Sequence, residues 1–297
     1  MISGPGAGPA TACNEELHAR VMDVCARAKQ YLLTRQGPDG GFCVYRSQYV
    51  DDANLGDTAS AIHALTLLSH PVPSPERVVA FLSTFIGSKQ PIHLLHLLET
   101  WRVLRPNEWL DALLLEGVMA LTLPTFPGMD VQQTGWLERT RAVLLLKRLV
   151  GDEQTIARAA AFVRSLADGG AFGMTPNLWD TWLALDILSL GGRINEVGEQ
   201  SRSFVDLLQC LPAGFTLTPR SRVATLSTVF AGVECCRLLN LPLRYPEEML
   251  RFIVGCQGQR GGFAQSPGSL PDIELTDRAI SVLLSVCSRH GETFRSV

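Results

Sequence analysis

The sequence predicts an all-α protein in which six helical hairpins close into a ring around a central apolar cavity. A glycine–phenylalanine turn recurs along the chain, and the segments that follow the turns have the composition of helices buried on both sides. Of the 297 residues, 46% are apolar and 19% are charged. This composition provides for a large core and excludes a disordered chain.

The recurring turn is a single or paired glycine followed closely by phenylalanine. It occurs at Gly40-Gly41-Phe42, Gly169-Gly170-Ala171-Phe172, Gly214-Phe215 and Gly261-Gly262-Phe263. The last three phenylalanines are 43 and 48 residues apart. The 130 residues that separate Phe42 from Phe172 leave room for about three such steps. Weaker versions, Phe85-Ile86-Gly87 and Phe126-Pro127-Gly128, stand in that interval. The spacing therefore predicts six units, with glycine supplying a positive φ at each turn.

Each unit is predicted to hold one helix before the turn and one after it. The later helices, such as Thr58–Leu65, Thr181–Leu188 and Thr276–Leu283, are apolar nearly all round, as expected for an inner layer. The earlier helices, such as Ile156–Leu166 and Glu247–Gly255, are amphipathic and belong outside. Because a ring leaves no helix pair exposed at an end, we favour a closed ring over an open solenoid.

We expect one domain over residues 15–290, with flexible tails at 1–14 and 291–297. The net charge of −3 gives no electrostatic reason to expect a nucleic-acid partner. The sequence shows neither a run of about 18 apolar residues for a membrane span nor a signal-peptide pattern. The scattered cysteines lack a CxxC pair, which favours reduced thiols in a cytoplasmic protein over a zinc or disulfide framework.

At the first unit the sequence resembles a known enzyme family. Gly40-Gly41-Phe42, then Tyr49, then Asn54-Leu55-Gly56-Asp57-Thr58-Ala59, is similar to the opening of the catalytic domain of squalene-hopene cyclases and related class II terpene cyclases. In that family an Asp-x-Asp-Asp-Thr-Ala motif follows a Gly-Gly-Phe turn. The last unit, from Gly261 through Asp272, resembles a repeat of protein prenyltransferase β subunits. Both families have the α/α toroid fold, which the resemblance implies over about residues 15–290.

The acidic motif of the cyclases is only partly present in this chain. The family's proton-donating Asp, the middle acid of the motif, aligns with Gly56, and its first Asp aligns with Asn54. The last acid, which supports the donor in the family, is kept as Asp57. The resemblance therefore implies cyclase chemistry if Asp51 or Asp52 has taken over as the donor. Asp57, Asp52 and Asp51 are the candidate catalytic residues.

The zinc ligands of the prenyltransferases have no counterparts here. The position of the family's His aligns with Leu275. Its Asp and Cys ligands align with Asn177 and Trp179, or with Val223 and Thr225 in the other register. Zinc requires ionisable nitrogen, sulfur or oxygen ligands, which neither register provides. His93 and His96 are spaced for one metal but have no third ligand, so we predict no metal and no cofactor.

The three aspartates suggest an acid. Carboxylates crowded into an apolar pocket keep a proton to higher pH, and such an acid could protonate an alkene or an epoxide while aromatic faces stabilise the cation. The alternative is that Asp51 and Asp52 lie on a solvated loop while Asp57 caps an inner helix. Asp180 stands before a threonine in the same way, which is consistent with capping.

Basic and aromatic side chains on the predicted inner helices are candidates for substrate binding. The candidates are Arg139, Arg222, Arg278, Trp136, Trp179 and Trp182. Three guanidinium groups could hold a diphosphate, because arginine binds phosphate in a bidentate manner. The alternative is that these arginines pair with neighbouring acids such as Glu138 and Asp277.

The sequence therefore predicts an isoprenoid-handling enzyme, an acid-initiated terpene cyclase or isomerase acting in the central cavity on an isoprenoid or another apolar small molecule. One alternative is a non-catalytic toroid that binds a lipid-like ligand or a partner protein. Others are a metal-independent prenyltransferase-like protein and a carbohydrate-active helical barrel with paired carboxylates. A partner subunit or a peripheral membrane contact is compatible with each of these.

Overall fold

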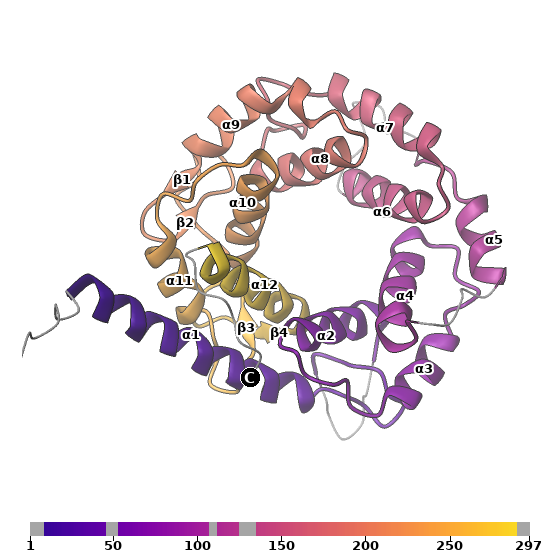
Figure 1. The fold of residues 1–297 in the computed structure, drawn as a ribbon, viewed down its shortest axis with the longest axis horizontal. Coiled ribbons are helices and arrows are strands. Elements are labelled where there is room, and N and C mark those ends of the chain that lie inside the picture. The colour runs from indigo at the N-terminus through magenta and orange to yellow at the C-terminus, as the bar shows by residue number, and fades with distance from the viewer. Residues whose placement is uncertain (1–8, 46–52, 107–111, 125–134, 290–297) are drawn as a thin grey trace, which may run out of the picture.

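The computed structural model describes residues 9–45, 53–106, 112–124 and 135–289, which form a two-layered ring of helices (Figure 1). The inner layer consists of α2 (Leu55–Leu67), α4 (Pro91–Leu104), α6 (Trp136–Leu149), α8 (Leu178–Leu190), α10 (Leu226–Leu239) and α12 (Ile273–Arg289). The outer layer consists of α1 (Pro9–Leu33), α3 (Pro75–Ser83), α5 (Ala112–Ala120), α7 (Glu153–Ser165), α9 (Gly198–Leu207) and α11 (Pro246–Gly255). The predicted alternation of inner and outer helices is confirmed.

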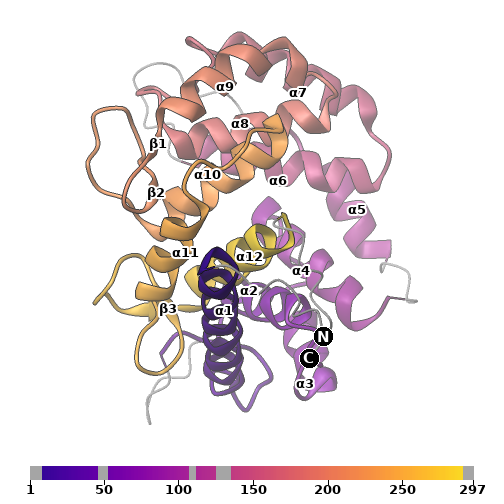
Figure 2. The same ribbon diagram turned by 60° about the vertical axis from the view of Figure 1, so that its left-hand side comes forward.

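The ring is closed. The last inner helix, α12, packs against α2, and the outer helix α1 packs against both α11 and α12, as Figure 1 and Figure 2 show from two sides. The α/α toroid prediction is therefore confirmed, and an open superhelix is excluded. Helix α1 begins at Pro9, so part of the segment 1–14 that the sequence predicts as a tail is helical. The predicted tail at 291–297 lies outside the described residues.

Short strands and one turn of 3₁₀-helix connect the helices. Strands β1 (Gln209–Cys210) and β2 (Gly214–Phe215) pair antiparallel, with Gln209 opposite Phe215. Strands β3 (Phe263–Ala264) and β4 (Pro271–Asp272) pair with Phe263 opposite Asp272. The 3₁₀-helix η1 covers Ile194–Glu196. The strands thus form at two of the glycine–phenylalanine turns, and the pairing of β3 with β4 brings one of these turns to the start of α12.

Helices α2 and α8 begin with the same capping arrangement. Asn54 Oδ1 accepts the N–H of Asp57 at 2.8 Å, and its Nδ2 donates to Asp57 Oδ2 at 2.7 Å. Asn177 and Asp180 repeat these bonds at 2.9 Å and 2.7 Å. The asparagine side chain accepts a backbone N–H that has no partner within the helix. The aspartate carboxylate accepts a bond from the same asparagine side chain and so holds it in position. Asp57 therefore takes part in the cap of α2.

A buried threonine ties each of three turns to its inner helix. Its Oγ1 accepts the backbone N–H of the turn's phenylalanine and donates to the carbonyl of the residue that caps the helix. The N–H to Oγ1 pairs are Phe42 with Thr58 (2.9 Å), Phe172 with Thr181 (3.1 Å) and Phe263 with Thr276 (2.9 Å). The phenylalanines are fully buried, so each of these bonds fixes a wedge between helices.

The glycine of the turn lies against the outer helix of the next hairpin. Gly261 has φ +91°, and a Cβ there would overlap the backbone carbonyl of Arg27 in α1. Gly40 stands in the same way against Arg77 of α3, and Gly170 against Gln200 of α9. A side chain is therefore excluded by both backbone conformation and space. At Gly261 the neighbouring hairpin is the first one, so this contact closes the ring.

Candidate functional site

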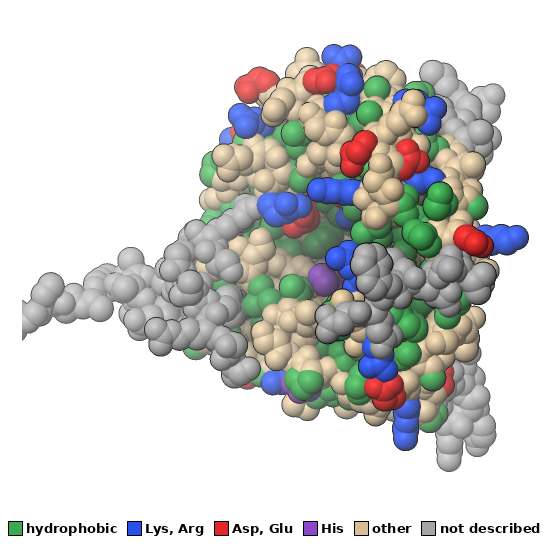
Figure 3. Space-filling model, turned by 45° about the vertical axis from the view of Figure 1, so that its right-hand side comes forward, with side chains coloured by type: hydrophobic (Ala, Val, Ile, Leu, Met, Phe, Trp, Pro, Cys, Tyr) green, Lys and Arg blue, Asp and Glu red, His purple; other side chains and the backbone are tan. Residues whose placement is uncertain are grey.

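The ring is hollow. Figure 3 shows hydrophobic, basic, acidic and histidine side chains together on the wall of a depression in the face it presents. Because the outer helices cover the other face of each inner helix, the exposed side chains in the middle of an inner helix face this hollow. The inner helices therefore decide what the hollow can bind.

At the start of α8 and α10 lies a pocket of 670 Å³, which we call the mouth pocket. It is lined by the first turns of these helices, by the loop before α10, and by Arg278 of α12. Trp179 and Asp180 line it from α8, and Ser227 and Gln265 line it from the opposite side. The pocket thus combines an aromatic surface with several hydrogen-bonding groups.

An aromatic cluster made of Trp179, Trp182 and Phe230 extends from the mouth pocket into the wall. The ring centroids of the two tryptophans are 4.8 Å apart, and those of Trp182 and Phe230 are 5.1 Å apart. Arg278 lies over Trp179 at 4.8 Å and over Phe230 at 5.8 Å, while Arg141 lies over Trp182 at 5.4 Å. These faces hold cations within the protein itself, as expected from the negative potential above an aromatic ring.

The inner helices also carry five ionisable side chains, each on a different helix, which we call the charged belt. They are His63 (α2), Glu99 (α4), Arg141 (α6), Asp186 (α8) and Asp277 (α12). His63 Nδ1 lies 2.7 Å from Asp277 Oδ1, and Arg141 Nε lies 2.6 Å from Asp186 Oδ2. The sequence predicted an apolar cavity. The structure places ionisable side chains among the apolar ones.

Burial and pairing change the proton affinities in the charged belt. The hydrogen bond that Asp277 accepts from the His63 imidazole raises the pKa of His63. Burial raises the pKa of Asp277, and the bond to His63 offsets part of that rise. Burial also raises the pKa of Glu99, against the opposing effect of Arg141 and His63. Groups whose proton affinities are shifted in this way are suited to proton transfer.

The predicted catalytic cluster is only partly described. Asp51 and Asp52 lie outside the described residues. Burial raises the pKa of Asp57. Two hydrogen bonds to its carboxylate lower that pKa, one from the Asn54 amide and one from the N–H of Val44, whose nitrogen is 3.3 Å from Oδ2. The nearby carboxylate of Asp272 raises it further. Asp57 therefore has the altered proton affinity expected of an acid, although its carboxylate is held in a helix cap.

Gly56, the position aligned with the cyclase donor, lies beside α4. A Cβ at Gly56 would be 3.8 Å from the imidazole of His96, which is an ordinary contact. Burial lowers the pKa of His96. His93 instead contacts Ser88, with 3.3 Å between its Nδ1 and the hydroxyl oxygen. Within the described part of the chain, no group of three or more potential ligands is arranged to hold a metal ion.

The predicted substrate-binding residues do not all meet. Trp179, Trp182 and Arg278 come together in the aromatic cluster, where Arg278 also pairs with Glu274 and donates to Ser227 Oγ at 3.0 Å. Arg222 is exposed on the loop before α10, and Arg139 is exposed in the first turn of α6. Neither lines the mouth pocket.

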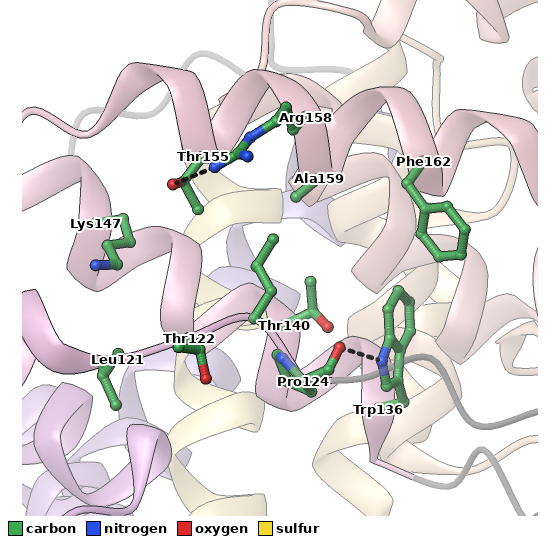
Figure 4. A pocket seen from close by; sticks show the side chains of 11 residues that line it. Leu121, Thr122, Pro124, Trp136, Thr140, Lys147, Thr155, Arg158, Ala159 and Phe162 are labelled. Carbon is green, nitrogen blue, oxygen red and sulfur yellow. Dashed lines mark hydrogen bonds between the residues drawn. The ribbon is translucent and has the colours of Figure 1, made fainter.

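Trp136 lines a different pocket, shown in Figure 4. This pocket of 540 Å³ lies between α6, α7 and the segment after α5. The Trp136 ring stands 5.9 Å from Phe162, and its Nε1 donates to the Pro124 carbonyl at 3.2 Å. Lys147 and Arg158 line the same pocket from α6 and α7. Trp136 is therefore placed between the two layers of the ring.

The sequence prediction did not include Phe230 and most of the charged belt among the site residues. A signal was present, because His63, Glu99 and Asp186 are each the ninth residue of their inner helix. Polar residues at one repeated position of otherwise apolar helices mark a common level in the ring.

None of the described helices is long and apolar enough to cross a lipid bilayer.

The comparisons with known proteins agree with this architecture. The family model of the prenyltransferase alpha-alpha toroid domain matches residues 10–105 and 196–296. None of the curated proteins compared with the chain matches it.

Among solved structures, the chain is similar to the type II terpene cyclase MstE from Scytonema. One structure of a variant of that enzyme holds geranylgeranyl dihydroxybenzoate, its substrate; the TM-score is 0.61 at 12% identity, over 92% of this chain and 99% of that chain. Another variant holds merosterolic acid A, its product, with a TM-score of 0.60 at 13% identity and the same coverage. The family model covers more than half of the sequence, and the chain therefore belongs to the prenyltransferase alpha-alpha toroid domain family.

Proposed function

We propose that this protein is an isoprenoid-handling enzyme, an acid-initiated cyclase or isomerase that works in the hollow of its ring. The observation that carries the proposal is the meeting of the aromatic cluster and the charged belt, which are joined where Arg141 contacts both Trp182 and Asp186. Proton addition to an alkene needs an acid and leaves a carbocation. Aromatic faces stabilise that cation, and an enclosed site keeps water from it.

The similar structures support this choice of substrate class. MstE variants hold a geranylgeranyl compound as substrate and merosterolic acid A as product in a ring of the same fold. At 12–13% identity the likeness extends to the fold, so the substrate of this chain is inferred from its own hollow. An apolar substrate suits a site whose mouth presents Trp179, with Trp182 and Phe230 packed behind that ring.

In this proposal Asp57, with Asp51 and Asp52, belongs to the acidic side of the site. Arg278 and Trp179 hold the substrate at the mouth pocket, and Trp182 supports the ring of Trp179 from behind. The roles of Arg139, Arg222 and Trp136 in binding stay predictions from the sequence. The proposal assigns no diphosphate to Arg278, because its guanidinium pairs with Glu274.

The test is incubation of the purified protein with squalene, geranylgeranyl diphosphate and a geranylgeranyl aryl acid, followed by chromatography with mass spectrometry. We expect a product of unchanged mass and fewer alkene protons by NMR, as cyclisation requires. Asp57→Asn should lower turnover by at least about tenfold, since loss of an acid costs roughly 10²–10⁴ and loss of its support costs less. Helicity by circular dichroism should stay the same.

A non-catalytic toroid that binds a lipid-like ligand is the second candidate. It is favoured by one observation, that Asp57 has the same hydrogen bonds as Asp180 and so has a structural task. If all three substrates remain unchanged while one of them quenches the fluorescence of Trp179 and Trp182, the binding function replaces the enzymatic one.

A further inference from the structure

Glu99 differs from the other acids of the hollow. It lies in the middle of α4, and its side chain is exposed toward the hollow. Asp186 accepts a bond from Arg141, and Asp277 is bonded to His63. Within the described ranges of the chain, Glu99 has neither a hydrogen bond nor an ion pair. Its carboxyl group is therefore available to a molecule that enters the hollow.

Three charged groups from three neighbouring elements act on Glu99. They are Arg141 on α6, His63 on α2 and Asp277 on α12. Helix α4 packs between α2 and α6, so the two cationic groups come from opposite sides. The outer helices α3 and α5 pack on α4 from outside the ring. Glu99 thus lies between two potential cations on the wall of the hollow.

This setting suits an acid in both of its protonation states. Before reaction, desolvation within the ring raises the pKa of Glu99, although its side chain is exposed to the hollow, and favours the neutral carboxyl. After proton loss, Arg141 stabilises the carboxylate, and the His63 imidazolium adds to this once its ring has taken up a proton. Asp57 has a different setting, because it accepts hydrogen bonds from Asn54 and from the N–H of Val44. Such bonds favour the charged form before reaction.

His63 has one ring nitrogen engaged and one directed elsewhere. Its Nδ1 lies 2.7 Å from Asp277 Oδ1, which fixes a proton on Nδ1 in the neutral ring and leaves Nε2 as the basic atom. Asp277 also stabilises the imidazolium that forms when Nε2 takes a proton. The side chain of His63 is 58% exposed, so a ligand in the hollow can reach it.

We propose that Glu99 is the acid of the hollow and that the His63–Asp277 pair is the base that returns the proton to it. This inference rests on the proposed function. The O–H bond of Glu99 breaks, and the π electrons of a substrate alkene form a new C–H bond, which leaves a carbocation. After rearrangement a neighbouring C–H bond breaks, its electrons form the new double bond, and the proton passes to His63 Nε2. Transfer from the imidazolium to the Glu99 carboxylate restores the starting state.

The test compares four variants with the wild type on the substrates named above. Glu99→Gln should lower kcat by about 10²–10⁴ while KM changes little, because the amide keeps the shape but has no proton to give. His63→Asn places an amide nitrogen where Nδ1 stood, so it keeps the bond to Asp277 but has no Nε2. It should lower kcat by at least about tenfold and remove one limb of the pH profile. Thermal melting of Glu99→Gln should match the wild type, and that of His63→Asn should match it at pH 9, where the imidazole is neutral.

Glu234→Gln is the matched control. Glu234 is also the ninth residue of its inner helix, α10, and is half-buried, but it pairs with Arg237 at 2.9 Å. Its substitution should leave turnover at the wild-type level. Glu99→Asp should recover part of the activity that Glu99→Gln loses, because it restores a carboxyl group one methylene shorter.

The outcomes separate the two proposals. A wild type that turns over none of the substrates overturns the proposed function and this inference with it. An active wild type whose Glu99→Gln variant keeps its kcat overturns only the role of Glu99, and loss of activity in Asp57→Asn alone then assigns the acid to Asp57. An active wild type whose His63→Asn variant keeps its kcat and its pH profile overturns the role of the pair.

Discussion

At the scale of the residue, the pair formed by His63 and Asp277 affects both the proposed proton transfer and the stability of the fold. The two side chains come from the first and last inner helices, so their bond lies on the seam that closes the ring. The bond raises the pKa of His63 in the folded protein. The stabilising contribution of His63 is therefore complete below the ordinary histidine pKa of about 6.5 and is lost as the pH rises through the folded value.

Asp277→Asn should accordingly lower the pKa of His63, which NMR titration of the imidazole would measure. The free energy of unfolding that the variant loses should be larger at pH 5.5 than at pH 9, because only the protonated ring depends on the carboxylate. Urea unfolding at both pH values measures this difference. An equal loss at the two values would show that the pair contributes packing and no charge interaction.

Residues also show where sequence reasoning reached its limit. The sequence prediction selected Arg139, whereas the arginine at the aromatic cluster is Arg141. Two positions along a helix differ by about 200° in direction, so the two side chains point to opposite sides. Because the charged residues of α6 point to more than one side of the helix, periodicity could not tell which side faces the hollow. The positions of Trp179 and Arg278 were predicted, because they lie near the start of their helices.

At the scale of the element, a repeated hydrogen bond explains why the turn and the inner helix appear together in the sequence. The threonine that follows the cap accepts the N–H of the turn's phenylalanine in three hairpins. The turn residues and Thr58 or Thr181 could therefore be read from the sequence as one repeating pattern. The paired asparagine and aspartate that cap α2 and α8 belong to the same pattern.

Thr181→Val tests this bond, because valine has nearly the same shape and leaves the buried N–H of Phe172 without an acceptor. We expect the variant to lose about 1–3 kcal/mol of unfolding free energy in urea. Thr66→Val is the control, since Thr66 is exposed and bonds only to a carbonyl within α2. Equal stability of the two variants would contradict the assignment.

At the scale of the whole molecule, the ring depends on a contact between its first and last hairpins. Gly261 lies against Arg27 of α1 with a positive φ, and α12 lies against α2. In a repeat array without such a contact, each repeat is stabilised only by its neighbours, and each end repeat has only one. Closure gives every hairpin two neighbours, so we expect the ring to unfold in one transition.

Gly261→Ala should lower the free energy of unfolding by more than about 2 kcal/mol, because alanine is strained at this φ and meets the backbone of α1. Gly198→Ala is the control, since a Cβ at Gly198 meets no atom within 4 Å. Denaturation followed by circular dichroism and by tryptophan fluorescence would show whether the variant still unfolds in one step. A Gly261→Ala protein as stable as the control would show that closure does not depend on this contact.

The same contact has a consequence for how the protein is made. The ribosome delivers Arg27 early and Gly261 late, so most hairpins leave the exit tunnel before the two can meet. Until then the apolar faces of the early inner helices have no final partner and are open to misassociation or to chaperones. During synthesis, the chamber in which chemistry is proposed to occur comes into existence only with the last hairpin.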